Sequence, residues 1–379
     1  MNIVVLRENT SGERRIPLIP PSAEKLVKLG ANVQIESGLG ATIGLADEAY
    51  TKVGAQIFPD RPAALAAADL VLRLRKPDPA DLPSIKKGAL HVSYLDPFNE
   101  KALVRALAAS GVSAFSLELI PRSTIAQKMD VLSSQANLAG YVAVVLAAQR
   151  LDKIFPMMST PAGTIAPARV FIIGAGVAGL QAIATAKRMG AIVEAFDTRA
   201  VVEEQVKSLG AKFVKVDLGE TGQTKDGYAK ALTEEQLAKQ REAMARHCAG
   251  ADVVITTAQV FGRPAPRILT AAMVAGMKPG SIVVDLAIET GGNVEGAVLD
   301  QEVEVNGVRI IGLGNLPGRV PVHASQMFSS NLVNFVEHFW DKTNKTFDLR
   351  MDDEIIKGSL VTHGGEVVHP VIKPLIGKE

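Results

Sequence analysis

Short apolar runs alternate with helix-like segments along most of this chain. In the first third, apolar runs at 2–6, 32–36, 55–58, 70–74, 89–94 and 113–117 predict strands, and segments 22–29, 47–53, 61–68 and 100–110 predict helices. Apolar runs at 170–173, 191–196, 213–216, 253–257, 281–286 and 308–313 repeat the strand pattern further along. Strands that alternate with helices form parallel sheets covered on both faces. The pattern therefore predicts an α/β fold with two parallel-sheet lobes.

Two long helices are expected where the lobes join. Residues 131–154 contain no proline, and residues 325–340 follow Pro321. Both segments lie at the ends of the second α/β block, so we expect the chain to cross between the lobes twice. The expected domains are residues 1–130 plus 325–379 and residues 131–324, since 379 residues exceed one ordinary core. A cleft between two such lobes is a common place for a cofactor.

Three further segments are expected to lie outside the two sheets. The stretch between Pro161 and Pro167 reads as a glycine-containing loop, and residues 362–367 read as a hairpin. Residues 217–233 carry three glycines and Tyr228 without apolar periodicity. Such a stretch predicts a long surface loop, and loops of this length in compact domains are often lids.

The pattern Gly174-Ala175-Gly176-Val177-Ala178-Gly179 directly follows an apolar run and opens a helix-like one. In a dinucleotide-binding turn the first glycine permits a tight turn, the second lets the backbone approach a pyrophosphate, and the third allows close packing of helix and strand. Asp197 ends the next strand, where a carboxylate accepts hydrogen bonds from the adenosine ribose. Its charge would repel a 2′-phosphate. The pattern predicts a Rossmann-like lobe that binds NAD(H) rather than NADP(H).

A polar stretch, residues 121–134, lies between a predicted strand and the first long helix. Arg122, Gln127, Asp130 and Ser133 all follow a strand end, where open α/β sheets place ligands. One interpretation is structural: Asp130 caps the helix and pairs with Arg122. The other is a clamp for a nicotinamide ring, because hydride transfer needs a positioned ring rather than a nucleophile or a metal.

Composition narrows the class of protein. The formal net charge of +1 argues against a nucleic-acid partner, and the single cysteine, Cys248, indicates a reducing compartment. We expect no signal peptide and no segment that spans a membrane. The six histidines show no metal-ligand spacing, so structural or surface roles are expected. Residues 12–15, Gly-Glu-Arg-Arg, are compatible with carboxylate binding, but a solvated loop is favoured.

Taken together, these residues resemble the NAD(H)-binding component, domain I, of proton-translocating nicotinamide nucleotide transhydrogenase. Residues 122–134 resemble that family's Arg-Gln-Asp loop, residues 174–199 its nucleotide fingerprint, and residues 227–230 its mobile loop with a tyrosine. Segments 278–287, 291–293 and 314–317 add further support. The resemblance implies catalytic positions at Arg122, Gln127, Asp130 and Ser133. It implies cofactor contacts at Gly174, Ala175, Gly176, Val177, Ala178, Gly179, Asp197, Thr198, Arg199, Tyr228, Gly314 and Asn315.

Alanine dehydrogenase belongs to the same wider group and is the alternative enzyme. It uses a lysine after a Val-rich strand and a histidine in a Tyr-Leu-His segment, but this chain has Arg75 and Asp96 there. Arginine stays protonated at any working pH, and an ordinary aspartate titrates far below neutrality. Arg15 still matches the family's substrate arginine, so the amino-acid site reads as a relic. A second alternative is an NAD-binding protein without hydride transfer.

The resemblance implies a homodimer that exchanges hydride directly with NADP(H) on a separate domain III, with Si/Re stereospecificity. The coupled proton movement is expected in a membrane component, domain II, so this chain is expected in the cytoplasm and peripheral to the inner membrane. It reads as either a separate subunit or a truncated piece.

Overall fold

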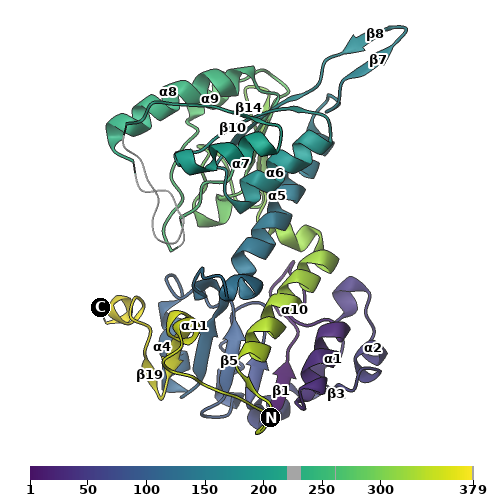
Figure 1. Ribbon diagram of the computed structural model, residues 1–379, viewed down its shortest axis with the longest axis vertical. Coiled ribbons are helices and arrows are strands. Elements are labelled where there is room, and N and C mark those ends of the chain that lie inside the picture. The colour runs from purple at the N-terminus through teal and green to yellow at the C-terminus, as the bar shows by residue number, and fades with distance from the viewer. Residues whose placement is uncertain (220–231, 261, 378–379) are drawn as a thin grey trace. The chain divides into compact units, whose positions relative to one another are not determined.

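The computed structural model describes residues 1–219, 232–260 and 262–377. The chain forms two compact units, unit 1 with Met1–Gln135 and Val320–Glu379, and unit 2 with Ala136–Arg319. Each unit is an α/β fold built around its own sheet (Figure 1). The α/β class with two lobes is thus confirmed.

Unit 1 contains an eight-stranded sheet in the order β19-β18-β6-β5-β4-β1-β2-β3. The strands β1 to β6 are parallel, and the C-terminal β18 and β19 join antiparallel at the β6 edge. The strand bounds are β1 Asn2–Val5, β2 Asn32–Glu36, β3 Gln56–Phe58, β4 Leu70–Leu72, β5 Leu90–Ser93, β6 Ser113–Ser116, β18 Leu360–His363 and β19 Glu366–Val367. The six predicted strands and the hairpin at 362–367 are confirmed.

Helices cover both faces of this sheet because its strands are apolar on both sides. Ile3 and Val5 of β1 belong to one buried cluster, which α10 completes with Phe328 and Phe335. Val4, between them, belongs to the opposite cluster. The helices of unit 1 are α1 Pro20–Lys28, α2 Asp47–Thr51, α3 Arg61–Ala67, α4 Lys101–Ala109, α10 Pro321–His338, α11 Glu354–Ser359 and α12 Lys373–Ile376.

Unit 2 contains a seven-stranded sheet in the order β11-β10-β9-β12-β13-β15-β14, parallel except for β14 at one edge. Its strands are β9 Arg169–Ile173, β10 Ile192–Phe196, β11 Lys212–Phe213, β12 Val253–Thr256, β13 Ile282–Asp285, β14 Gln301–Val305 and β15 Val308–Gly312. Its helices are α6 Val177–Arg188, α7 Glu203–Ser208, α8 Glu234–Gly250 and α9 Ala271–Ala275. This sheet is a nucleotide-binding type of scaffold, with the order reversing at β9.

The first long helix, α5 Val131–Arg150, begins in unit 1 and ends in unit 2. Its Gly140 packs on the first turn of α6, where a methyl group would lie 2.1 Å from the Ala178 carbonyl oxygen. The chain re-enters unit 1 at Val320, immediately before α10, which starts earlier than expected because Pro321 is favourable in a first helical turn. By length and composition, α5 is the one described helix that could cross a membrane, a test that core helices of soluble proteins also pass.

Three elements of unit 2 differ from the sequence expectations. The stretch expected as a loop before the fingerprint is a hairpin, β7 Met158–Thr160 with β8 Gly163–Ile165, which projects from unit 2 (Figure 1). The edge strand β14 and the long helix α8 were not predicted. The helix α8 buries only Gln240, Met244 and Cys248, one residue per turn, so its apolar periodicity is faint. Its capping box at Thr233 and Gln236 was the readable signal.

Candidate functional site: a glycine turn and a polar loop

The turn between β9 and α6 depends on two of its three glycines for the fold itself. Gly174 has φ +101°, and a methyl group there would lie 2.4 Å from the Thr257 hydroxyl oxygen. A methyl group at Gly179 would lie 1.9 Å from the Gly174 carbonyl oxygen, so helix and turn pack at backbone contact. These are the conformational and packing roles expected of the first and third glycines.

Gly176 is different, because nothing in the described fold requires a glycine there. Its φ of −79° suits any residue, and a methyl group would meet only an Arg199 nitrogen, at 3.9 Å. Gly176 is the N-cap of α6 and offers no side chain to the N–H groups of the first turn. Such an open helix N-terminus suits a phosphate group. Space beside the backbone at Gly176 is what the approach of a pyrophosphate requires.

Asp197, at the end of β10, holds the same turn. Its Oδ2 accepts from the Ala175 N–H at 2.7 Å, and its Oδ1 accepts from the Arg199 N–H at 2.9 Å. The Arg199 guanidinium adds two more bonds, Nε to Oδ1 at 2.9 Å and Nη2 to Oδ2 at 2.8 Å. The predicted ribose acceptor therefore already carries an ion pair. Because Arg199 neutralises its charge, Asp197 repels a 2′-phosphate less strongly than the sequence suggested.

The other predicted cofactor residues follow strands of the same sheet, whose parallel strands end at one edge. Gly314 and Asn315 follow β15; the Gly314 N–H donates to Asp300 at 3.0 Å, and Asn315 has φ +45°. Val177 and Ala178 form the first turn of α6, and Thr198 lies between Asp197 and Arg199. Tyr228, with residues 227–230, lies outside the described residues.

Two residues at this edge were not predicted as site residues. Thr257, after β12, donates its hydroxyl to the Gly174 carbonyl at 3.1 Å. Asn293 accepts from the Ala258 N–H at 3.0 Å and donates to the Ala258 and Pro266 carbonyls. Both residues shape the turn beside the glycines. The only sequence signal was the Gly291-Gly292-Asn293 segment, which carried no role of its own.

The polar loop of unit 1 precedes α5. Asp130 Oδ1 accepts from the Ser133 N–H at 2.8 Å, and the Ser133 hydroxyl donates to Asp130 Oδ2 at 2.6 Å. Asp130 is thus a helix cap, as the structural interpretation predicted. Arg122 and Gln127 are exposed, and Gln127 lies on the short 3-10 helix Ala126–Met129. These side chains can reach a ligand, and Asp130 keeps acceptor capacity.

The α10 helix fixes the path of this loop. The side-chain amides of Asn331 and Asn334 both donate to the Lys128 carbonyl, at 2.9 and 3.0 Å. Asn331 Oδ1 also accepts from the Ser134 hydroxyl at 2.7 Å. Because α10 comes about 200 residues later in the chain, sequence spacing could not indicate these supports.

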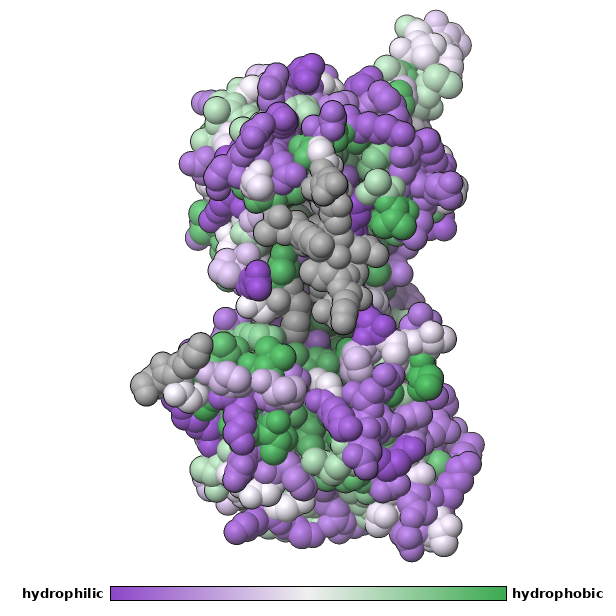
Figure 2. Space-filling model, turned by 60° about the vertical axis from the view of Figure 1, so that its left-hand side comes forward, coloured by the Kyte–Doolittle hydropathy of each residue, from purple (hydrophilic) through white to green (hydrophobic). Residues whose placement is uncertain are grey.

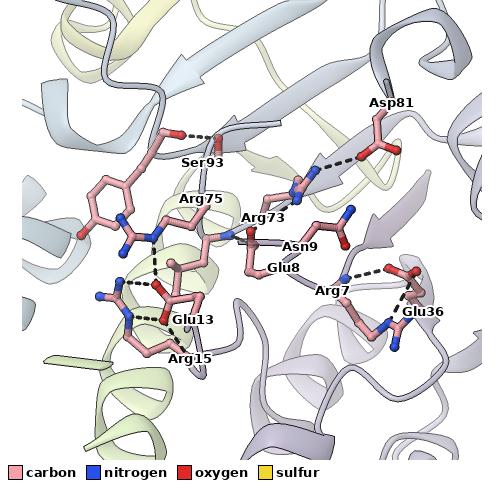
Figure 3. A network of polar contacts seen from close by, with 12 residues as sticks. Arg7, Glu8, Asn9, Glu13, Arg15, Glu36, Arg73, Arg75, Asp81 and Ser93 are labelled. Carbon is pink, nitrogen blue, oxygen red and sulfur yellow. Dashed lines mark hydrogen bonds and ion pairs between the residues drawn. The ribbon is translucent and has the colours of Figure 1, made fainter. Parts of the chain in front are cut away.

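Residues 12–15 are not a solvated loop, which corrects the favoured sequence interpretation. The Glu13 side chain is fully buried and bonded by Arg15, through Nε at 2.8 Å and Nη2 at 2.7 Å, and by Arg75 Nε at 2.8 Å (Figure 3). Arg15 also donates to Gln135 at 2.9 Å. Burial alone would raise the pKa of Glu13, but the hydrogen bonds and charges of Arg15 and Arg75 lower it to about 2.

A second buried network lies beside the first. Arg73 pairs with Glu8 at 3.3 Å and with Asp81 at 2.9 Å, and Asp81 also binds Arg61 (Figure 3). Burial raises the pKa of Glu8 despite the Arg73 charge. The two arginines that a small carboxylate substrate would need, Arg15 and Arg75, are both occupied by Glu13. The alternative of carboxylate binding at residues 12–15 therefore requires displacement of a buried carboxylate.

Among the described residues, no group of three or more His, Cys, Asp and Glu side chains is arranged to hold a metal ion. His91 illustrates the roles that the histidines take instead. It is fully buried on β5 and shares a hydrogen bond with Ser93 at 3.0 Å. Burial lowers the pKa of His91 to about 3, with a further contribution from the Arg73 charge. It is a neutral core residue.

Comparison with known proteins places this geometry in a family. The family described as Alanine dehydrogenase/PNT matches residues 4–139 with its N-terminal domain and residues 143–370 with its C-terminal domain. An NAD(P) transhydrogenase subunit alpha of Rhodospirillum rubrum is 44% identical over 98% of this chain and 99% of its own length.

Solved structures agree with that assignment. Transhydrogenase from Sinorhizobium meliloti has a TM-score of 0.85 and 42% identity, covering 98% of this chain and 100% of that one. An L-alanine dehydrogenase has a TM-score of 0.83 and 26% identity, with full coverage of both chains. The chain belongs to the Alanine dehydrogenase/PNT family and, within it, to the alpha subunits of NAD(P) transhydrogenase.

Proposed function

We propose that this chain is the NAD(H)-binding component of a proton-translocating transhydrogenase and takes part in direct hydride exchange with NADP(H) on a partner domain. The observation that carries the proposal is Gly176. The fold explains Gly174 and Gly179 through protein contacts, but only a ligand at the α6 N-terminus gives Gly176 a purpose.

NAD(H) is the proposed nucleotide. Its pyrophosphate would lie at the N–H groups that begin α6, with Asp197 accepting from the adenosine ribose. Val177, Ala178, Thr198, Gly314 and Asn315 complete the proposed binding residues, together with Tyr228 from the segment outside the described residues. The edge of the sheet where β9, β10 and β15 end supports this assignment, since ligands of open α/β sheets bind there.

Arg122, Gln127, Asp130 and Ser133 are proposed to orient the nicotinamide. Bound NAD(H) supplies or accepts the hydride, so the chain needs to hold the ring at reacting distance and keep it there. Exposed Arg122 and Gln127 provide donors, and the Asp130–Ser133 pair is rigid because it also caps α5. Asn331 and Asn334 anchor the loop from behind, which limits its motion.

Alanine oxidation is the less favoured function. In this chain Arg75 is paired with Glu13, and Asp96 stands at the position where alanine dehydrogenase carries its histidine. Burial raises the pKa of Asp96, but Asn99 and the Lys76 charge oppose that rise. A protein that only binds NAD would have no use for a preformed polar loop, which argues against that alternative.

The remaining partners are a domain III that holds NADP(H), a membrane domain II that moves the proton, and a second copy of this chain. The β7–β8 hairpin supports the homodimer, because it is uncharged, exposes Met157, Met158 and Ile165, and projects from unit 2 with little hydrophilic surface (Figure 2). An open hollow of about 580 Å³, lined by residues 148, 151–156 and 189, lies in the same unit. The chain is proposed to be cytoplasmic and held at the membrane through these partners.

A mixing experiment tests the function. The full chain is combined with a transhydrogenase NADP(H)-binding domain, and transfer from NADH to an oxidised NADP analogue is followed with Si/Re-resolved deuterium labels. The chain is then assayed with alanine and NAD. Transfer in the first mixture and no turnover in the second are expected. Alanine oxidation would overturn the proposal.

Arg122→Ala sharpens the test. We expect transfer to slow by at least tenfold more than NADH binding weakens, because positioning affects the reaction rather than the ground-state complex. Lys128→Ala removes an equal charge from the same loop and serves as the control. Equal losses in rate and binding would make Arg122 a binding residue only.

A further inference from the structure

The carboxylate of Asp197 is saturated by groups of this chain. Within the described residues it accepts four hydrogen bonds, two at each oxygen, from Ala175, from the Arg199 backbone and from the Arg199 guanidinium. An ionised carboxylate has about four acceptor positions. A ribose diol that donates to Asp197 must therefore take positions that are already filled.

Only two of the four donors can leave at low cost. The Ala175 and Arg199 N–H groups belong to the turns after β9 and β10 and are fixed by the backbone. The Arg199 guanidinium stands on a flexible side chain that is 15% exposed, over a carboxylate that is 6% exposed. The ribose hydroxyls can thus replace Nε and Nη2 while the turn keeps its shape.

The displaced guanidinium stays close to the place where the nucleotide phosphates are expected. Its Nη2 lies 3.9 Å from the position that a methyl group on Gly176 would occupy, next to the α6 N-terminus. A guanidinium beside the ribose is the group that accommodates a 2′-phosphate in dinucleotide-binding turns. Arginine also binds phosphate with paired, parallel hydrogen bonds.

We propose that Arg199 is a specificity-determining residue, a displaceable cap on Asp197 that sets how strongly this site prefers NADH over NADPH. This inference rests on the proposed binding of NAD(H) at the glycine turn. In the capped site Asp197 is neutralised, so NADH competes with the guanidinium while a 2′-phosphate gains a partner. Removal of Arg199 exposes the carboxylate, which favours the diol and repels the phosphate.

The test is a binding titration of the full chain with NADH and with NADPH, for wild type and variants. Arg199→Ala is expected to raise the NADH-to-NADPH affinity ratio at least tenfold. Arg199→Lys keeps the charge and should move the ratio less. Arg188→Ala, which removes an exposed arginine at the other end of α6, should leave the ratio unchanged and controls for the general charge of unit 2.

A double-mutant cycle adds a second readout. Asp197→Asn should improve NADPH binding because it releases the guanidinium, and Asp197→Asn with Arg199→Ala should lose that gain. A gain that persists in the double variant would contradict the cap. Equal weakening of both nucleotides by Arg199→Ala would also contradict it, because Arg199 would then contact a group common to both.

Failure of the cap and failure of the proposed function give different results. If wild type binds neither nucleotide, both the proposed function and the cap are overturned. If wild type binds NADH and the ratio ignores Arg199, only the cap is overturned. Thermal unfolding of each variant shows whether it is folded, and Arg199→Lys decides the ratio should Arg199→Ala not fold.

Discussion

The two units build the same kind of strand-to-helix step and use it in opposite ways. In unit 1, residues 6–19 separate β1 from α1, and they fold back so that Glu13 meets Arg15 and Arg75. Their N–H groups are also taken up, since Ser325 and Ser329 of α10 accept from Ile16 and Ile19. In unit 2, only residues 174–176 separate β9 from α6, and the first turn of the helix stays open.

The difference shows that the connection decides whether a parallel sheet has room for a ligand. A long connection with its own charges fills the end of the sheet with protein, while a short glycine turn leaves backbone donors available. The two arginine-bound carboxylates make the same point. Glu13 is held by residues from separate segments, whereas Asp197 is held by its second neighbour and two backbone groups.

The largest effect is expected from Gly179→Ala. The methyl group would lie 1.9 Å from a backbone oxygen, so α6 must shift, and we expect nucleotide binding to fall by about a hundredfold or more with a loss of about 3 kcal/mol in stability. Titration with NADH and denaturant unfolding measure both. Gly276→Ala, where the nearest atoms are 3.5 Å away, is the matched control. Unchanged binding in Gly179→Ala would remove the glycine turn from the site.

Glu13→Ala is expected to be the most costly change in the closed connection. It leaves the buried Arg15 guanidinium without its main partner, and breaking such a pair costs about 3 to 5 kcal/mol. Urea unfolding measures the loss, and Glu48→Ala, on the surface helix α2, supplies the baseline. A loss below about 1 kcal/mol would mean that the closed connection is not held by this network.

The pH dependence of stability should show the same network. The folded pKa of Glu13 is lowered to about 2 from 4.5, so its contribution is complete above pH 4.5 and is lost as the pH falls towards 2. The difference in unfolding free energy between wild type and Glu13→Gln should therefore shrink by up to roughly 3 kcal/mol over that range. Guanidinium unfolding at several pH values measures it, and a constant difference would contradict the assignment.

Asp197→Ala should have the smallest effect on stability. Arg199 can turn towards solvent after the substitution, so the cost is expected to be about 1 to 2 kcal/mol, mainly from the unpaired Ala175 N–H. NADH affinity should nevertheless fall clearly. A stability loss as large as that of Glu13→Ala would contradict the distinction between a locked and a displaceable carboxylate.

The sequence predicted those regions of the fold in which local pattern and final environment agree. The parallel strands are apolar on both faces, and Gly174, Gly179 and Asp197 act at close range within one strand-turn-helix unit. The hairpin β7–β8 and the edge strand β14 were not predicted, because exposed antiparallel edges carry no apolar run to mark them. The helix α8 was missed for the same reason.

By itself, the sequence determined the α/β class, the two lobes, the glycine turn and the polar loop, because spacing along one strand or one helical turn is a local property. Only the tertiary structure decided which charges meet. Glu13 is brought to Arg75 across 62 residues, and Asn331 to Lys128 across 203. It also decided that Asp197 already holds Arg199, since two residues that are close in sequence pair only when the turn points both side chains the same way.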